Sequence, residues 1–153
     1  YDKTNVFSFW MRSMSKHYDA VKAEVLQQPG VLDVTRSSSD IVRIGGISDA
    51  TDWDGKAPNS NFIVHPIAVD KNFISFFRMK MVAGAAFTGA PTDTARFILN
   101  EEAVKEIGMK DPIGKRFSMS GINGKITNAA VYRRSAKTSA ATGFRRPAEG
   151  RMC

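Results

Sequence analysis

The sequence predicts an α+β domain. Three observations support this fold class. A strand-like, a helical and a second strand-like pattern follow one another within the first 38 residues, and an apolar strand runs directly into a well-capped helix near residue 100. Of the 153 residues, 42% are hydrophobic and 24% are charged, which is close to the average for a single soluble globular domain.

No apolar stretch reaches the roughly 18–20 residues that a membrane-spanning helix needs. The first residues lack the charged, apolar and small-residue zones of a signal peptide, and the chain does not begin with Met. We therefore expect a globular piece of a longer protein.

The first two patterns are a strand and a helix. Asn5–Met11 is a run of aromatic and β-branched residues without Gly or Pro, which favours a strand. The period then changes over Met14–Gln28, where Tyr18, Val21 and Val25 recur at three- and four-residue spacing. This spacing predicts an amphipathic helix that packs on a sheet.

Pro29 and Gly30 end this helix, and an extended apolar pattern resumes over residues 31–36. Strand, helix and strand within about 35 residues are typical of a βαβ-like unit. The pattern does not determine whether its strands are parallel.

Residues 37–58 are rich in Ser, Asp and Gly, and they contain an Asp-Gly turn signal at Asp54-Gly55 directly after Trp53. Two interpretations of this tryptophan stay open. An exposed Trp on a turn is a binding anchor for a partner or a sugar, whereas a Trp that folds back covers a small hydrophobic core.

A strand is expected over Asn61–Val69, at a sheet edge or with a bulge, because Pro66 cannot donate a hydrogen bond to a neighbouring strand. A short helix over Asp70–Phe77 follows. An extended piece over Met79–Val82 then ends at Gly84.

The most regular part of the sequence is a strand over Ala95–Leu99 that continues into a helix. Asn100 is a favourable N-cap, Glu101 and Glu102 place carboxylates at the positive end of the helix dipole, and Gly108 suits its C-terminal end. The expected buried face consists of Ala103, Val104 and Ile107. A turn over 111–114, a strand over Lys115–Met119 and a hairpin-type turn over Ser120–Gly124 are expected to follow.

The excess of positive charge lies in the tail. The chain has 22 basic and 15 acidic residues, a net +7. Residues 127–153 hold six of the bases and one of the acids, so residues 1–126 carry only +2. The tail has no apolar period, so we expect it to be disordered or poorly packed. We expect no nucleic-acid partner, because no aromatic platform accompanies the bases.

Residue types for catalysis or metal binding are few. His17 and His65 have no second ligand at close spacing, and Cys153, the only cysteine, cannot form a disulfide within the chain. Glu101 and Glu102 point about 100° apart on a helix. They therefore complement the helix dipole better than they form a catalytic pair.

Asp49, Asp52 and Asp54 form an acidic loop, but this loop lacks the glycine and the closing glutamate of a calcium-binding loop. On a strand, Asp52 and Asp54 would share one solvated face. No serine lies in a Gly-x-Ser-x-Gly elbow, and the sequence has no phosphate-binding glycine loop. We therefore expect no catalytic residues, no metal, no cofactor and no enzyme activity.

Five segments in order resemble those of a known family. They are Pro29–Thr35, Trp53–Lys56, Val69–Phe73, Met79–Phe87 and Ile98–Lys115. In this order they are similar to the extracytoplasmic core domain of MacB/FtsX-type ABC transporter permeases, in the form common in Bacteroides-like bacteria. The resemblance covers residues 1–126.

The resemblance implies a porter-like subdomain of βαβ units, with a small mixed α/β subdomain (called Sabre in the best-known members) inserted between them. Residues 1–38 match the first half of the porter-like subdomain, and residues 39–126 match the Sabre-like subdomain. Residues 127–153 have no counterpart in the family.

The resemblance also implies a place on the periplasmic side of the bacterial inner membrane. A cytoplasmic ATP-binding subunit or domain would hydrolyse ATP, and the periplasmic domain would transmit that cycle mechanically. Its partners would be a homodimer mate and a periplasmic adaptor or lipoprotein. The alternative is a periplasmic or secreted module without catalysis that binds a glycan or a protein through the Trp53 loop.

The sequence departs from the family in two places. Gly84–Phe87 has Ala where the family usually has Arg, and after Gly124 the family has an apolar strand, then Asp-Phe and the second porter half. Lys125–Cys153 lacks this pattern, which indicates a truncation, a frameshift or added sequence. Half a porter leaves an apolar face uncovered, which predicts self-association or local disorder.

Overall fold

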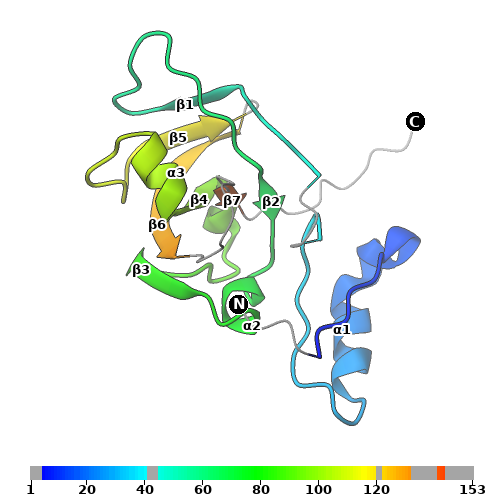
Figure 1. Ribbon diagram of the computed structural model, residues 1–153. Coiled ribbons are helices and arrows are strands. Elements are labelled where there is room, and N and C mark those ends of the chain that lie inside the picture. The colour runs from blue at the N-terminus through cyan, green and yellow to red at the C-terminus, as the bar shows by residue number, and fades with distance from the viewer. Residues whose placement is uncertain (1–4, 41–44, 120–121, 132–140, 144–153) are drawn as a thin grey trace.

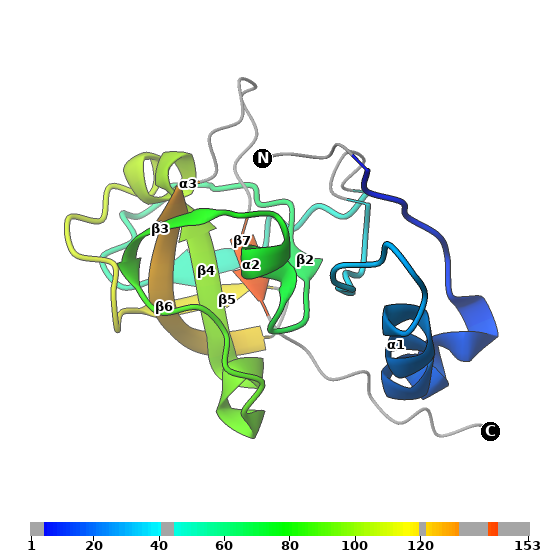
Figure 2. The same ribbon diagram turned by 90° about the horizontal axis from the view of Figure 1, so that it is seen from below.

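The computed structural model describes residues 5–40, 45–119, 122–131 and 141–143. They form a sheet body and a helical unit (residues 5–36), which contains the helix α1 (Tyr18–Leu26) and stands beside the sheet (Figure 1). The view turned by 90° shows the same separation (Figure 2). The fold is α+β, as the sequence predicts.

Within the described residues the sheet has seven strands in the order β1-β5-β6-β4-β7-β2, and β3 pairs with β6 outside this order. The strands are β1 (Thr51–Trp53), β2 (Ile67–Ala68), β3 (Lys80–Gly84), β4 (Arg96–Asn100), β5 (Arg116–Met119), β6 (Ile122–Val131) and β7 (Ala141–Gly143). The sheet is mixed, because β4 is parallel to β6 and β2 is parallel to β7, whereas the other pairs are antiparallel.

Strand β4 divides the core into two clusters, because successive residues of a strand point to opposite faces of the sheet. Phe97 and Leu99 face one cluster, and Ile98 faces the other. The helix α3 (Glu101–Glu106) contributes to the first cluster and the helix α2 (Phe73–Phe76) to the second. The first cluster also contains Trp53, Phe62, Val64, Phe117, Met119 and Ile126, and the second contains Ile67, Val69, Phe77 and Phe87.

The predicted strand-to-helix segment near residue 100 is confirmed. The Asn100 side chain accepts a hydrogen bond from the Ala103 backbone N–H at 2.9 Å and thereby caps α3. Ala103 is fully buried and Ile107 is 8% exposed. Gly108 ends the helix with φ +70°, a backbone conformation that favours glycine.

The other predicted helices are also present. The amphipathic segment begins as a 3₁₀-helix over Arg12–His17 and continues as α1, while Gly30 has φ +86° beyond its end. The short helix α2 and the strand β3 lie close to their predicted places. Among the helices of the described ranges, no segment has the length and apolarity that crossing a membrane would need.

The predicted strand over 61–69 is interrupted where Pro66 stands. Val64 forms an isolated bridge with Ser48, and regular pairing resumes only at β2. The predicted turn over 120–124 is wrong for its last three residues, because β6 already begins at Ile122.

Two predicted strands are wrong. Asn5–Met11 and residues 31–36 form no strand, so the expected βαβ unit is reduced to its helix within the described part of the chain. A strand needs a neighbour for its backbone groups, and strand propensity alone does not supply one. Residues 36–38 instead make single contacts with the segment before α2, including an isolated bridge between Ser37 and Val69.

The tail prediction needs a correction. Residues 127–131 belong to β6 and residues 141–143 to β7, although the sequence predicts no strand beyond Lys125. The backbone of β6 pairs with β3 and β4 there, and this pairing overrides the weak side-chain pattern. The other residues of the predicted tail lie outside the described residues, and so do Ile41, Val42 and Ile44, a short apolar stretch of the sequence.

Candidate functional site

The Trp53 side chain is part of the core. It is 4% exposed and packs edge-to-face on Phe62, with ring centroids 5.9 Å apart. The Lys56 ammonium lies 5.1 Å from the centre of the indole ring and covers it. The structure therefore decides for a core residue, and Trp53 is not available as a binding anchor.

The acidic loop holds an arginine. The Arg116 guanidinium lies 2.8 Å from Asp52 Oδ2 and 3.4 Å from Asp54 Oδ1. The hydrogen bond from Arg116 holds the pKa of Asp52 below its usual value. Asp49 is exposed. In the ranges that the structure describes, no group of three side chains could hold a metal ion, so Asp49 does not complete a metal site with Asp52 and Asp54.

The remaining candidates lie apart from one another. His17 is exposed at the end of the 3₁₀-helix, and His65 Nδ1 lies 3.1 Å from the Gly46 carbonyl oxygen. Glu101 and Glu102 are in the first turn of α3, where Glu102 forms an exposed ion pair with Lys105 at 2.9 Å. None of these contacts brings two candidate residues together.

Asp70, which the sequence does not single out, joins segments that lie far apart in the chain. The residue is 7% exposed, and its carboxylate has partners in both the helical unit and the sheet body. Oδ2 accepts a hydrogen bond from the Tyr18 hydroxyl at 2.5 Å and faces the Lys22 ammonium at 3.8 Å. Oδ1 accepts a hydrogen bond from the Thr35 hydroxyl. We call these four residues the Asp70 junction.

Further contacts surround the junction. The Arg36 guanidinium lies 4.3 Å from the centre of the Tyr18 ring, and the Arg36 carbonyl accepts a hydrogen bond from the Asp70 backbone N–H at 3.0 Å. Asn72 donates its backbone N–H to Asp70 Oδ1 at 3.2 Å and its side-chain amide to Asp33 Oδ1 at 3.2 Å. Three segments therefore meet at one buried carboxylate: α1, residues 33–36, and the turn before α2.

Burial raises the pKa of the Tyr18 hydroxyl far above its usual value, and the hydrogen bond to the Asp70 carboxylate raises it further. Tyr18 is therefore a neutral donor at physiological pH. Tyr18 is also the only buried residue of α1. The attachment of this helix to the sheet body thus depends on the buried, hydrogen-bonded Tyr18 together with the Lys22 ammonium, which faces the same carboxylate.

The sequence carries only weak signals of the individual residues of this junction. Asp70 directly follows the apolar residues before it, at the start of a predicted helix, and Tyr18 is on the apolar face of the predicted helix. Nothing in either pattern pairs residues that are 52 positions apart. Such a contact follows only from the folded arrangement.

The fold matches solved domains. The periplasmic region of MacB from Actinobacillus actinomycetemcomitans superposes with a TM-score of 0.58 at 13% sequence identity, over 82% of this chain and 54% of that one. The chain shares the fold of that periplasmic region. A permease-protein domain from Porphyromonas gingivalis superposes with a TM-score of 0.59 at 19% identity, over 80% and 49% of the two chains.

The chain thus spans about half the length of these two solved domains. The extracellular domain of the noncanonic ABC-type transporter YknZ from Gram-positive bacteria matches with a TM-score of 0.49 at 11% identity, over 78% of this chain and 66% of that one. No protein-family model matches the chain, and no curated protein matches it significantly in sequence. The resemblance to MacB-type domains is confirmed at the level of the fold.

Proposed function

We propose that this chain is the periplasmic domain of an ABC transporter permease and that it acts by transmitting movement without catalysing a reaction. The observation that carries the proposal is the fold shared with the MacB periplasmic region. The division into a porter-like part (residues 1–38) and a Sabre-like part (residues 39–126) belongs to the same proposal.

The Asp70 junction is suited to this role. A domain that transmits movement needs its parts to move together, and here one buried carboxylate receives donors from both parts. Separating them would break the hydrogen bonds that the Asp70 carboxylate accepts from Tyr18 and Thr35, which is energetically unfavourable. Movement of α1 is therefore passed on to the turn before α2 and from there to the sheet.

The partners are also part of the proposal. A cytoplasmic ATP-binding subunit or domain supplies the energy, a homodimer mate moves against this domain, and a periplasmic adaptor or lipoprotein receives the movement. The domain itself lies on the periplasmic side of the inner membrane.

The test uses the parent permease, reconstituted in proteoliposomes with its ATP-binding partner. Asp70→Ala should leave ATP hydrolysis in place and lower the ATP-driven output by about tenfold or more, the size of a typical coupling free energy. Glu102→Gln, which removes an exposed ion pair, is the control and should change neither quantity. If no ATP-binding partner co-purifies with the parent protein, or if Asp70→Ala leaves the output unchanged, the proposal is wrong.

A further inference from the structure

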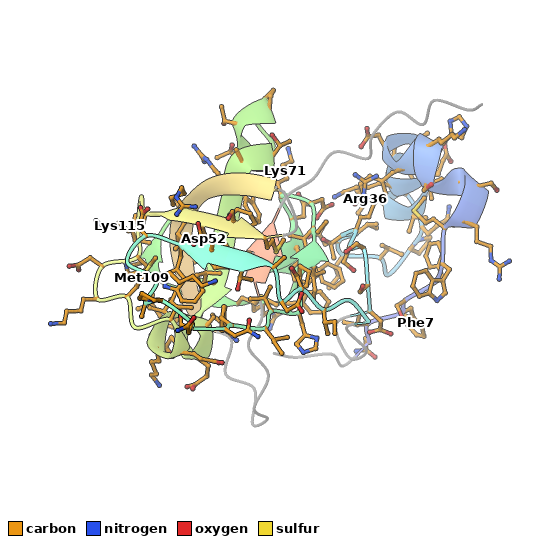
Figure 3. All side chains as sticks on the ribbon, turned by 90° about the horizontal axis from the view of Figure 1, so that it is seen from above. Phe7, Arg36, Asp52, Lys71, Met109 and Lys115 are labelled. Atoms are coloured by element: carbon orange, nitrogen blue, oxygen red, sulfur yellow. The ribbon has the colours of Figure 1, made fainter. Side chains whose placement is uncertain are left out.

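The helical unit contains a segment whose large aromatic side chains are exposed. Phe7 is 91% exposed, Phe9 is 63% exposed, Trp10 is 75% exposed and Met14 is 48% exposed. We call residues 7–17 the aromatic segment. Figure 3 shows Phe7 at the opposite end of the molecule from Met109 and Lys115. Large apolar side chains exposed together mark an interaction surface.

These apolar side chains are exposed although the segment is attached to the rest of the molecule at both ends. Val6, directly before it, packs against the second core cluster, and Tyr18, directly after it, is buried in the Asp70 junction. The segment is thus attached at both ends and presents its aromatic side chains outward between them.

The charges of this segment have one sign. Arg12 and Lys16 are exposed, and no acidic residue occurs between Asn5 and Tyr18. The nearest acid along the chain is Asp19, in the first turn of α1. Bulky aromatic residues next to bases are the combination that enters the interface of an anionic membrane, where the rings reach the headgroup level and the cations meet lipid phosphates.

We infer that the aromatic segment docks the domain onto an anionic lipid surface. Phe7, Phe9 and Trp10 are the side chains that enter the interface, and Arg12 and Lys16 bind the headgroups. A second copy of the chain fits the same face less well, because two copies would bring like charges together. The inference does not depend on the transport role proposed above.

The test is co-sedimentation of the 153-residue chain with vesicles of phosphatidylcholine containing phosphatidylglycerol, and with vesicles of phosphatidylcholine alone. The chain should bind the anionic vesicles, and high salt should release part of it. Phe7→Ser with Trp10→Ser should lower the partition coefficient by about tenfold or more. Arg12→Gln with Lys16→Gln should lower it by about fivefold per charge.

Two matched controls separate this segment from the general positive charge. Ile47→Ser removes an apolar side chain that is 71% exposed in the loop before β1, and Lys110→Gln removes an exposed base near α3. Both should bind like the unchanged chain. Of the two tryptophans, Trp53 is buried, so a blue shift of the fluorescence on binding should disappear in Trp10→Ser.

Three results would overturn the inference. The first is an equal affinity for vesicles with and without phosphatidylglycerol. The second is binding that Phe7→Ser with Trp10→Ser leaves unchanged. The third is a dimer in light scattering that this double variant dissociates while the chain binds no vesicles, which would assign the face to a second copy.

Discussion

At the scale of single residues, the Tyr18 hydroxyl has two measurable effects. It donates to a buried carboxylate, so Tyr18→Phe removes a hydrogen bond to a charged group and should lower the free energy of unfolding by about 1–3 kcal/mol at neutral pH. The aromatic ring and its packing stay. Urea unfolding monitored by circular dichroism would measure the loss.

The same residue predicts a dependence on alkaline pH. Folding raises the pKa of Tyr18 above the ordinary value of 10.0. Its stabilising contribution is therefore complete below about pH 10 and is lost as the pH rises from there towards the folded pKa, because the unfolded chain releases the proton first. The difference in stability between the unchanged chain and Tyr18→Phe should narrow between pH 7 and pH 11. A constant difference would contradict the assignment.

At the scale of the elements, the pairing of β4 with β6 depends on a glycine. A Cβ at Gly124 would lie 2.5 Å from the Ala95 carbonyl oxygen and 2.8 Å from Phe97 Cε2. The first contact is with backbone, which cannot rotate away. Gly124→Ala should therefore destabilise the fold by about 1–3 kcal/mol, as overpacking of a core does.

A second glycine provides the control for this variant. A Cβ at Gly46 would meet no atom within 4 Å, so Gly46→Ala should leave the thermal midpoint unchanged or slightly raised. Differential scanning calorimetry of both variants compares them directly. Equal midpoints for the two variants would show that β4 and β6 do not approach each other this closely.

The helices and strands also differ in how well the sequence predicts them. The segment from β4 through α3 was predictable because its signals are local: an apolar run, the Asn100 cap and Gly108. The strand predicted over Asn5–Met11 failed because a strand is decided by a partner, which propensity does not reveal. The strand at the end of β6 was not predicted for the opposite reason. Its backbone pairs with β3 and β4, but its side chains show no strand-like pattern in the sequence.

The candidate site was harder to predict than the fold. Local patterns argued against a calcium-binding role for the acidic loop, and in the structure the carboxylates of Asp52 and Asp54 pair with Arg116. They could not decide whether Trp53 is exposed, because burial depends on Phe62 and Lys56. The Asp70 junction joins residues from three segments, so it appears only when the chain is folded.

At the scale of the whole molecule, the helical unit and the sheet body should differ in stability. The sheet body has two core clusters, whereas α1 buries only Tyr18. Regions with few buried apolar contacts open with a lower free energy than the core. The polar contacts of Asp70 therefore contribute much of the free energy that is needed to detach α1 from the sheet body.

Hydrogen exchange can test this difference. In Asp70→Ala, backbone amides of α1 should exchange faster by about tenfold or more, because the Tyr18 and Thr35 hydroxyls lose their acceptor. Amides of β4 should keep their protection.

The reciprocal control is Asp93→Ala, since Asp93 is fully buried in the sheet body and accepts hydrogen bonds from Thr88 and Gly89. That variant should accelerate exchange around β4 and leave α1 unchanged. If both variants instead accelerate both regions alike, the molecule opens as one unit and the Asp70 junction is not what attaches the helix.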